Sequence, residues 1–95
     1  MIFIETYIFT EDCKELLNDD EYHEFQQYLA DNPTAGDVIQ HTGGLRKVRW
    51  ASRGKGKRGG VRIIYYYKVD VSHIRLLLIY KKVSRMTLAN QKRKS

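Results

Sequence analysis

The densest group of side chains that could do chemistry lies between Arg46 and Arg62, a segment that holds eight of the seventeen Lys and Arg residues. The planar guanidinium of arginine binds phosphate through two parallel N–H donors, and the ammonium of lysine acts as a compact point charge. Tyrosines occur at 65–67 and at 80, and such rings stack on unpaired bases, at about 1–3 kcal/mol per base. The combination favours single-stranded nucleic acid over the grooves of a duplex.

The positions of these cations predict how they are arranged. Lys47, Arg49 and Arg62 flank residues 52–60, where four glycines and four bases indicate a mobile basic loop. Because side chains alternate along a strand, Lys47 and Arg49 share a face, and a hairpin could place Arg62 on that face with them. The loop tip could close over a bound strand. The further RNA-binding candidates in and beside this loop are Arg46, Lys55, Lys57 and Arg58.

The usual catalytic sets do not compete with this basic segment. Cys13 is the single cysteine, and no histidine stands at metal-ligand spacing from it or from carboxylates, so neither a metal nor another cofactor is expected. Gly54–Lys57 lacks the spacing and the Ser or Thr of a phosphate-binding P-loop. His23 and His73 are interpreted as surface or structural residues. His41 precedes the basic segment and stays open as a general acid or base.

Charge is divided sharply along the chain. Ten of the eleven acidic residues lie between Glu5 and Asp37 together with one base, a formal charge of −9. From Val38 onward there are sixteen Lys or Arg and one acid, a formal charge of +15. A strongly cationic region attracts polyanions and binds them in a salt-dependent manner. The alternative is a merely soluble surface, with acidic helices docked on a basic sheet.

Length and composition predict one compact domain over residues 1–95. Apolar residues make up 42% of the chain and charged residues 29%, as in ordinary globular proteins. No segment approaches the roughly 20 apolar residues that a membrane span needs, and the N-terminus lacks the pattern of a secretory signal. A lone cysteine gives no reason to expect an oxidising compartment. The expected location is the cytoplasm.

The N-terminal half predicts a strand followed by two helices. Residues 1–9 have the apolar and aromatic content of a strand, and residues 11–17 suit a short helix. Asn18 followed three residues later by Glu21 is the pattern of a capping box, which begins a second helix. This helix should end near Asn32–Pro33, because proline disfavours helical geometry in the residue before it. Its buried stripe is expected to consist of Tyr22, Phe25, Tyr28 and Leu29.

The second half predicts three strands that succeed one another as a meander. Residues 45–51, 61–69 and 74–80 have the β-branched and aromatic content of strands. The apolar run at 74–80 predicts a strand buried on both faces. The order of elements predicts an α+β fold, with two N-terminal helices packed on one face of a mostly antiparallel sheet. The basic tail at 83–95 is expected to be a frayed helix start or disordered.

Three segments of the chain together resemble the HigB branch of the RelE toxin superfamily. They are Gly36–Gln40 (GDVIQ), Thr42–Arg49 (TGGLRKVR) and Gly54–Tyr67 (GKGKRGGVRIIYYY). The likeness extends from about Phe3 to Lys82 and implies the small, barrel-like α+β domain shared by these toxins and microbial ribonucleases. It also implies cleavage of mRNA in the A site of the 30S ribosomal subunit. A cognate HigA-type antitoxin would neutralise that activity, and the pair would repress its own operon.

The resemblance implies roles for the cations on the two central strands. Lys47 and Arg49 match basic residues on the strand before the hairpin, and Arg62 matches the arginine that contacts the scissile phosphate. Cations around a phosphate stabilise the charge that develops during cleavage. We hypothesise that Arg62 stabilises this charge and that Arg49 positions the bound RNA strand. Lys47 is hypothesised to act as the general base that takes the proton of the nucleophile.

The last strand and the residues after it complete the implied site. Lys82, or its neighbour Lys81, matches a basic residue at the end of the last strand, and Lys82 is hypothesised to assist the leaving group. Tyr80 lies beside this position and matches an active-site tyrosine, while Tyr66 is a further stacking candidate. The family has a substantial C-terminal helix here, whereas residues 81–95 are short and basic. The C-terminal helix is therefore expected to be short or missing.

Three functions remain open from the sequence. The favoured one is a ribosome-dependent endoribonuclease. The second is a non-catalytic RNA- or ribosome-binding module, and the third is an inactive toxin remnant that still binds an antitoxin. A pure binder should lose affinity gradually with each cation removed, whereas a nuclease should lose turnover steeply at one or two positions.

Overall fold

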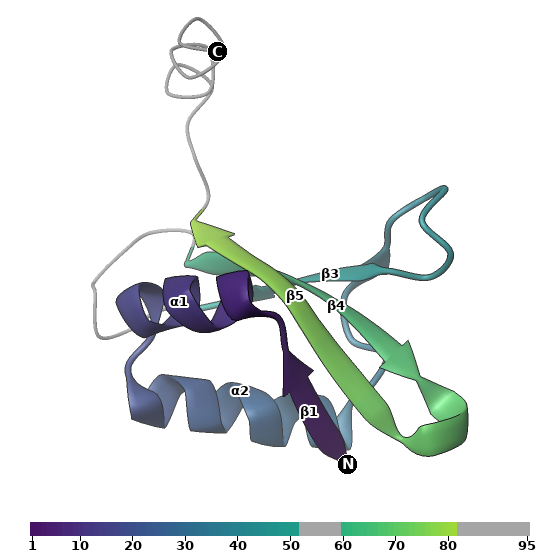
Figure 1. Ribbon diagram of the computed structural model, residues 1–95, viewed down its shortest axis with the longest axis horizontal. Coiled ribbons are helices and arrows are strands. Elements are labelled where there is room, and N and C mark those ends of the chain that lie inside the picture. The colour runs from purple at the N-terminus through teal and green to yellow at the C-terminus, as the bar shows by residue number, and fades with distance from the viewer. Residues whose placement is uncertain (52–59, 82–95) are drawn as a thin grey trace, which may run out of the picture.

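Two helices cover one face of a five-stranded sheet in the computed structural model, which describes residues 1–51 and 60–81 (Figure 1). The helices are α1 (Tyr7–Leu16) and α2 (Asp19–Asp31). The strands are β1 (Ile2–Glu5), β2 (Asp37–Val38), β3 (Arg46–Trp50), β4 (Val61–Lys68) and β5 (His73–Lys81), with a short 3-10 helix, η2 (Val69–Val71), between the last two. The predicted α+β arrangement is confirmed.

The sheet is mixed, with strands in the order β1-β5-β4-β3-β2. All neighbouring pairs are antiparallel except β1 and β5, which run parallel. The middle strand is β4, which is bonded to β3 on one edge and to β5 on the other. The sheet is therefore mostly antiparallel, as predicted, and its first strand lies beside its last described one.

Both helices begin at a side-chain cap. The capping box predicted for α2 is present: the Asn18 side chain accepts from the Glu21 amide at 2.8 Å, and the Glu21 carboxylate accepts from the Asn18 amide at 3.0 Å. In α1, Thr6 Oγ1 accepts from the Phe9 amide at 3.0 Å. This cap begins α1 at Tyr7, so the expected strand over 1–9 was wrong beyond Glu5, and the helix starts four residues before the expected Glu11.

The expectation that residues 74–80 are buried on both faces was wrong. Ile74 and Leu76 are fully buried, while Leu78 and Tyr80 are 45% and 40% exposed. The register between β4 and β5 shifts by one residue here, because Ile64 pairs with Leu78 but the next residue of β4 pairs with Leu76. Such a bulge adds one residue to one strand and changes which positions face inward beyond it. A regular alternation therefore could not describe the whole strand.

The core lies between the helix layer and the sheet. Phe9 and Phe25 from the helices, Ile63 from β4 and Leu76 from β5 are all fully buried in it. At its edge, the Trp50 ring of β3 packs edge-on against Phe25, with ring centres 5.3 Å apart. Burying an aromatic or aliphatic side chain contributes roughly 1.5–3 kcal/mol relative to leaving it exposed. These contacts fix the helices to one face of the sheet.

One buried tyrosine fastens the loop that leads into β2. The hydroxyl of Tyr65 on β4 lies 2.6 Å from the carbonyl oxygen of Ala35 and 3.1 Å from that of Pro33. Burial raises the pKa of Tyr65 to about 12, against a smaller opposite effect of Arg46. The ring is fully buried, so the expectation that it could stack on bases was wrong. Gly36 completes the loop, since a Cβ there would lie 2.3 Å from the Lys47 carbonyl oxygen.

We predict that Tyr65→Phe lowers the free energy of unfolding by about 1–2 kcal/mol, because part-buried carbonyl groups lose their donor. Urea unfolding followed by circular dichroism would measure the change. Tyr67→Phe is the matched control, because within the described chain its hydroxyl makes no hydrogen bond. Equal stabilities of the two variants would contradict the prediction.

Candidate nucleic-acid interface

The face of the sheet opposite the helices carries the cations that the sequence singled out. We call it the open face, because none of the described helices lies on it (Figure 1). Along β3, Val48 is buried against the core while Lys47 and Arg49 are exposed on the other side, as predicted. The side chains of the open face on β3, β4 and β5 are Lys47, Arg49, Arg62, Ile64, Tyr66, Lys68, His73, Arg75, Leu78 and Tyr80.

Strand register brings three cations together. Arg49 lies directly opposite Arg62, and Arg62 lies directly opposite Tyr80. These two arginines and the tyrosine therefore form one row across β3, β4 and β5. Residues that face each other in this way have Cβ atoms about 4.5–5.5 Å apart. Lys47 stands two residues from Arg49 on the same strand, about 7 Å away. We call Lys47, Arg49 and Arg62 the cationic cluster.

Like charges lie close together in the cationic cluster. Like charges directly opposite each other on a sheet are destabilising, and two charges about 7 Å apart repel by roughly 0.6 kcal/mol even in water. Among the described residues, Lys47 and Arg49 have no ion-pair partner. The acidic helices cannot serve as one, because the core separates them from the open face. A bound polyanion would relieve this repulsion.

An apolar strip borders the cationic cluster. The strip consists of Ile64 and Leu78, which lie in the same row as Lys47, next to the row of Arg49 and Arg62. Ile64 is almost fully buried, and Leu78 is exposed. Leu78 and the ring of Tyr80 offer exposed surfaces on which a base or ribose can lie while phosphates contact the cations. The open face thus has the mixed character that single-stranded nucleic acid requires.

Two of the predicted binding residues lie apart from the cationic cluster. Arg46 alternates to the core side of β3, where its Nη1 donates to the Thr34 carbonyl oxygen at 3.0 Å. Lys81 pairs with Val61 at the exposed end of β5 and is out of phase with Tyr80. Four further predicted residues and the expected basic tail lie outside the described residues: Lys55, Lys57, Arg58, Lys82 and the segment 83–95.

Sequence reasoning missed two residues of the open face. Asp37, in the two-residue strand β2, pairs directly with Lys47 and is exposed beside the cationic cluster. A strand this short has no alternation to detect, although Asp37 itself belongs to the GDVIQ motif. Arg75 is exposed opposite Tyr66. It was overlooked because its strand was expected to be buried on both sides.

Neither metal chemistry nor a membrane span finds support in the parts of the chain that the structure describes. Over residues 1–51 and 60–81, no three His, Cys, Asp or Glu side chains are grouped so that they could hold a metal ion. No helix within the same two ranges is long and apolar enough to cross a membrane. His41 lies in the turn before β3 with a positive φ of 64°, and its role as an acid or base stays a prediction.

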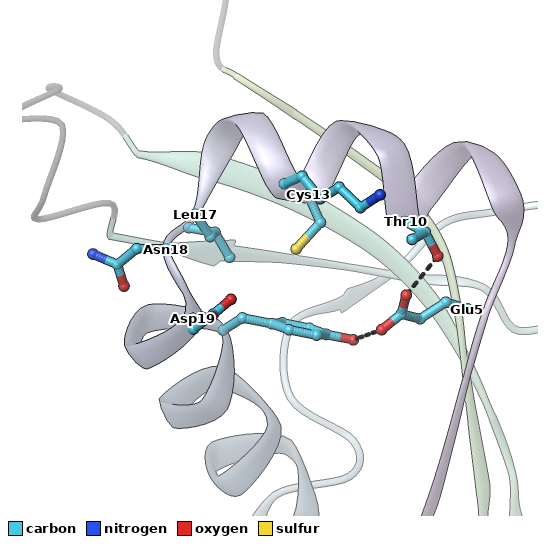
Figure 2. A pocket seen from close by; sticks show the side chains of 8 residues that line it. Glu5, Thr10, Cys13, Leu17, Asn18 and Asp19 are labelled. Atoms are coloured by element: carbon cyan, nitrogen blue, oxygen red, sulfur yellow. Dashed lines mark hydrogen bonds between the residues drawn. The ribbon is translucent and has the colours of Figure 1, made fainter.

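On the helix side, a cavity of about 100 Å³ lies between the start of α2 and the face of α1 (Figure 2). Glu5 points into it and accepts hydrogen bonds from Thr10 Oγ1, at 2.5 Å, and from the Tyr22 hydroxyl. Burial, and then the Glu5 carboxylate, raise the pKa of Tyr22. Burial raises the pKa of the Cys13 thiol to about 11, with smaller effects of Glu5 and Asp19. A thiol that stays protonated is a poor nucleophile, so this cavity offers no reactive group.

We predict that replacing Asp37 by Asn strengthens binding of single-stranded RNA about threefold at low salt. The variant removes one negative charge beside the cationic cluster. The repulsion between that charge and an RNA phosphate about 7 Å away is roughly 0.6 kcal/mol in water. Fluorescence anisotropy with an unstructured oligouridylate would measure the change, which should shrink at high salt. Asp12→Asn, on α1, makes the same change of charge on the other layer. Equal effects of the two variants would refute a local role for Asp37.

We predict that Cys13 in the folded protein reacts with a thiol reagent about 100-fold more slowly at neutral pH than in urea. Its pKa is raised from 9.0 to about 11, which lowers the reactive thiolate about 100-fold. Since folding favours the protonated thiol, its contribution to stability is complete below pH 9 and is lost as the pH rises toward 11. Stopped-flow absorbance gives both rates from the single cysteine. Similar rates in the two states would show that the thiol is accessible.

A scan of the sequence against models of known protein families finds no match. The resemblance of residues 36–67 to HigB toxins therefore stays a prediction, made from the motifs alone. The geometry of the open face is independent of that resemblance. It consists of three clustered cations, an apolar strip and exposed or half-buried tyrosine rings on one side of a rigid sheet.

Proposed function

We propose that this protein is an RNA-cleaving toxin of the RelE/HigB type, which cuts mRNA in the ribosomal A site. The observation that carries the proposal is the register of β3 and β4, which places Arg49 directly opposite Arg62 on the open face with Lys47 in the next row. Tyr80 extends the arginine row. Such a site can hold a phosphate among cations while an adjacent base rests on an aromatic ring.

The reaction proposed is transfer of the phosphodiester to the neighbouring ribose oxygen. The 2′-oxygen loses its proton to a base and attacks phosphorus, and the bond from phosphorus to the 5′-oxygen breaks. The leaving 5′-oxygen gains a proton, and a 2′,3′-cyclic phosphate remains on the upstream fragment. Negative charge builds up on the phosphoryl oxygens in the transition state, which guanidinium and ammonium groups stabilise in place. No oxidant, reductant or second substrate takes part.

The roles are assigned from position and side-chain chemistry. Arg62, in the middle strand, contacts the phosphate, because it lies between Arg49 and Tyr80 in the row. Lys47 takes the proton from the 2′-oxygen, and Arg49 positions the bound RNA strand. The leaving-group role proposed for Lys82 concerns a residue outside the described chain. An arginine suits contact with a phosphate, because its planar guanidinium donates two parallel hydrogen bonds at once.

An antitoxin is the second partner in this proposal. An exposed cationic face attracts an acidic, partly disordered segment that folds as it binds, and such charge complementarity speeds association. The HigA-type protein implied by the sequence resemblance would be of this kind. Its binding would compete with RNA wherever the two share the open face.

The competing function is a non-catalytic RNA- or ribosome-binding module. One observation favours it: no described histidine belongs to the cationic cluster, since His23 lies on α2, His41 in a turn and His73 at the opposite end of β5 from Tyr80. Without a histidine, proton transfer depends on a lysine, which is a weaker base for this task at neutral pH unless its surroundings favour the neutral form. An inactive remnant that retains antitoxin binding is the third candidate.

We predict that Arg62→Ala lowers cleavage of mRNA on translating ribosomes about 100- to 1,000-fold, the usual loss when one charge-stabilising donor is removed. Lys47→Ala should lower the cleavage rate steeply as well, while ribosome binding weakens only slightly. Primer extension maps the cut sites, and cosedimentation with ribosomes measures binding. Lys14→Ala is the matched control, because Lys14 is an exposed cation of α1, on the other layer.

The pattern of results separates the three functions. Cleavage at A-site codons that disappears with Arg62→Ala and persists with Lys14→Ala supports the nuclease. A folded wild-type protein that binds ribosomes without cutting is a binding module. A protein that neither cuts nor binds ribosomes, yet binds an antitoxin, is a remnant. Equal cleavage by wild type, Arg62→Ala and Lys47→Ala would overturn the assigned roles.

A further inference from the structure

We propose that the open face holds a second RNA contact, formed by Tyr66 and Arg75, which binds nucleotides adjacent to the one at the cationic cluster. The inference rests on the proposed RNA-directed function and adds to it a binding site with a defined direction along the sheet. Its basis is register: Tyr66 of β4 lies directly opposite Arg75 of β5, on the same face as Arg62.

Position along β4 makes this site distinct from the first. Arg62 and Tyr66 are four residues apart on one strand and on one face, a separation of about 13 Å at the usual rise per residue. The two positions are therefore far enough apart to hold different nucleotides of one RNA chain. Ile64 fills the space between them and is almost fully buried. RNA that contacts both positions must run lengthwise over this strand.

The surroundings of Tyr66 leave part of its ring open to a ligand. Gly44, in the turn before β3, lies beside it, and a Cβ at Gly44 would be 3.4 Å from Cε1 of the ring. Gly44 therefore approaches one edge of the ring without covering it with a side chain. Tyr66 is half-buried, and its hydroxyl makes no hydrogen bond within the described chain. A ring held by its strand but open on one side is suited to stacking on a base.

Arg75 supplies the charge that accompanies a stacked base. Its side chain is exposed, and its Cβ lies about 4.5–5.5 Å from that of Tyr66 in a direct cross-strand pair. Within residues 1–51 and 60–81 it has no ion-pair partner. Lys68, two residues beyond Tyr66, differs in this respect, because its Nζ lies 3.5 Å from Asp70. This ion pair reduces the positive charge at Lys68. In this proposal the bound RNA therefore ends at Tyr66 and Arg75.

Two lengths of RNA test the proposal. A dinucleotide of uridine, with a single internucleotide step, is too short to span the two positions, and an octanucleotide of uridine is long enough to reach both. Arg75→Ala should weaken octanucleotide binding about tenfold. It should also make the slope of log K against log salt concentration less steep by about 0.7, the value for one lost phosphate contact. It should leave dinucleotide binding unchanged. Fluorescence anisotropy over a range of salt concentrations gives both quantities.

The aromatic half of the site needs a separate pair of variants. Tyr66→Ala should weaken octanucleotide binding about tenfold, and Tyr66→Phe should restore it, since the ring and not the hydroxyl makes the contact. Because Tyr66 is half-buried, circular dichroism and thermal unfolding must first show that both variants fold. Arg75 is exposed, so the result with Arg75→Ala stands even where Tyr66→Ala does not fold.

Arg62→Ala distinguishes failure of this inference from failure of the proposed function. If Arg62→Ala weakens binding of both RNAs while Arg75→Ala and Tyr66→Ala leave both unchanged, the cationic cluster binds RNA and the second contact does not exist. If wild type and Arg62→Ala bind both RNAs equally, RNA recognition by the cationic cluster is itself wrong. A loss with Arg75→Ala that is equal for the two lengths would show a general effect of charge, and would also overturn the second site.

Discussion

The alternation of β4 between two environments is the constraint on which the rest of this structure depends. As the middle strand, β4 is hydrogen-bonded to a neighbour on each edge, so it cannot rotate without breaking both ladders. Ile63 and Tyr65 are thereby committed to the core, and Arg62 and Tyr66 to the opposite face. A slip of one residue would bury an arginine and expose the core. The same pairing thus secures both the core and the position of the cations.

This constraint also explains how one small chain carries two opposite charges without neutralising them. Eight of the eleven acidic residues belong to α1 and α2, while Lys47, Arg49 and Arg62 point away from the helix layer. An apolar core separates the two groups. A polyanion approaching such a molecule is repelled on one side and attracted on the other, which orients it before contact. The distribution of charge therefore favours productive encounters with the open face.

Local signals in the sequence predicted the parts of the fold that depend on local interactions. Asn18 and Glu21 indicated the start of α2, and alternation in β3 indicated the shared face of Lys47 and Arg49. Errors arose where distant contacts decide the outcome. The bulge beside Ile64 and Tyr65 depends on the pairing of two strands, and the loop before β2 is held by a tyrosine that is distant in the sequence. The members of the cationic cluster could thus be predicted, whereas its neighbour Asp37 and the more distant Arg75 could be placed on the open face only from the sheet.

The parallel pair of β1 and β5 has a consequence for how the chain reaches its folded state. Ile2 pairs with His73, and Thr6 Oγ1 donates to the Leu77 carbonyl oxygen across a separation of 71 residues. Contacts between such distant segments form late, because closing a long loop has an entropic cost that local contacts do not have. During synthesis, β1 cannot pair until β5, about 70 residues later in the chain, has also been made. The sheet that carries the cations is therefore completed only after β5 is available, which delays the appearance of the finished open face.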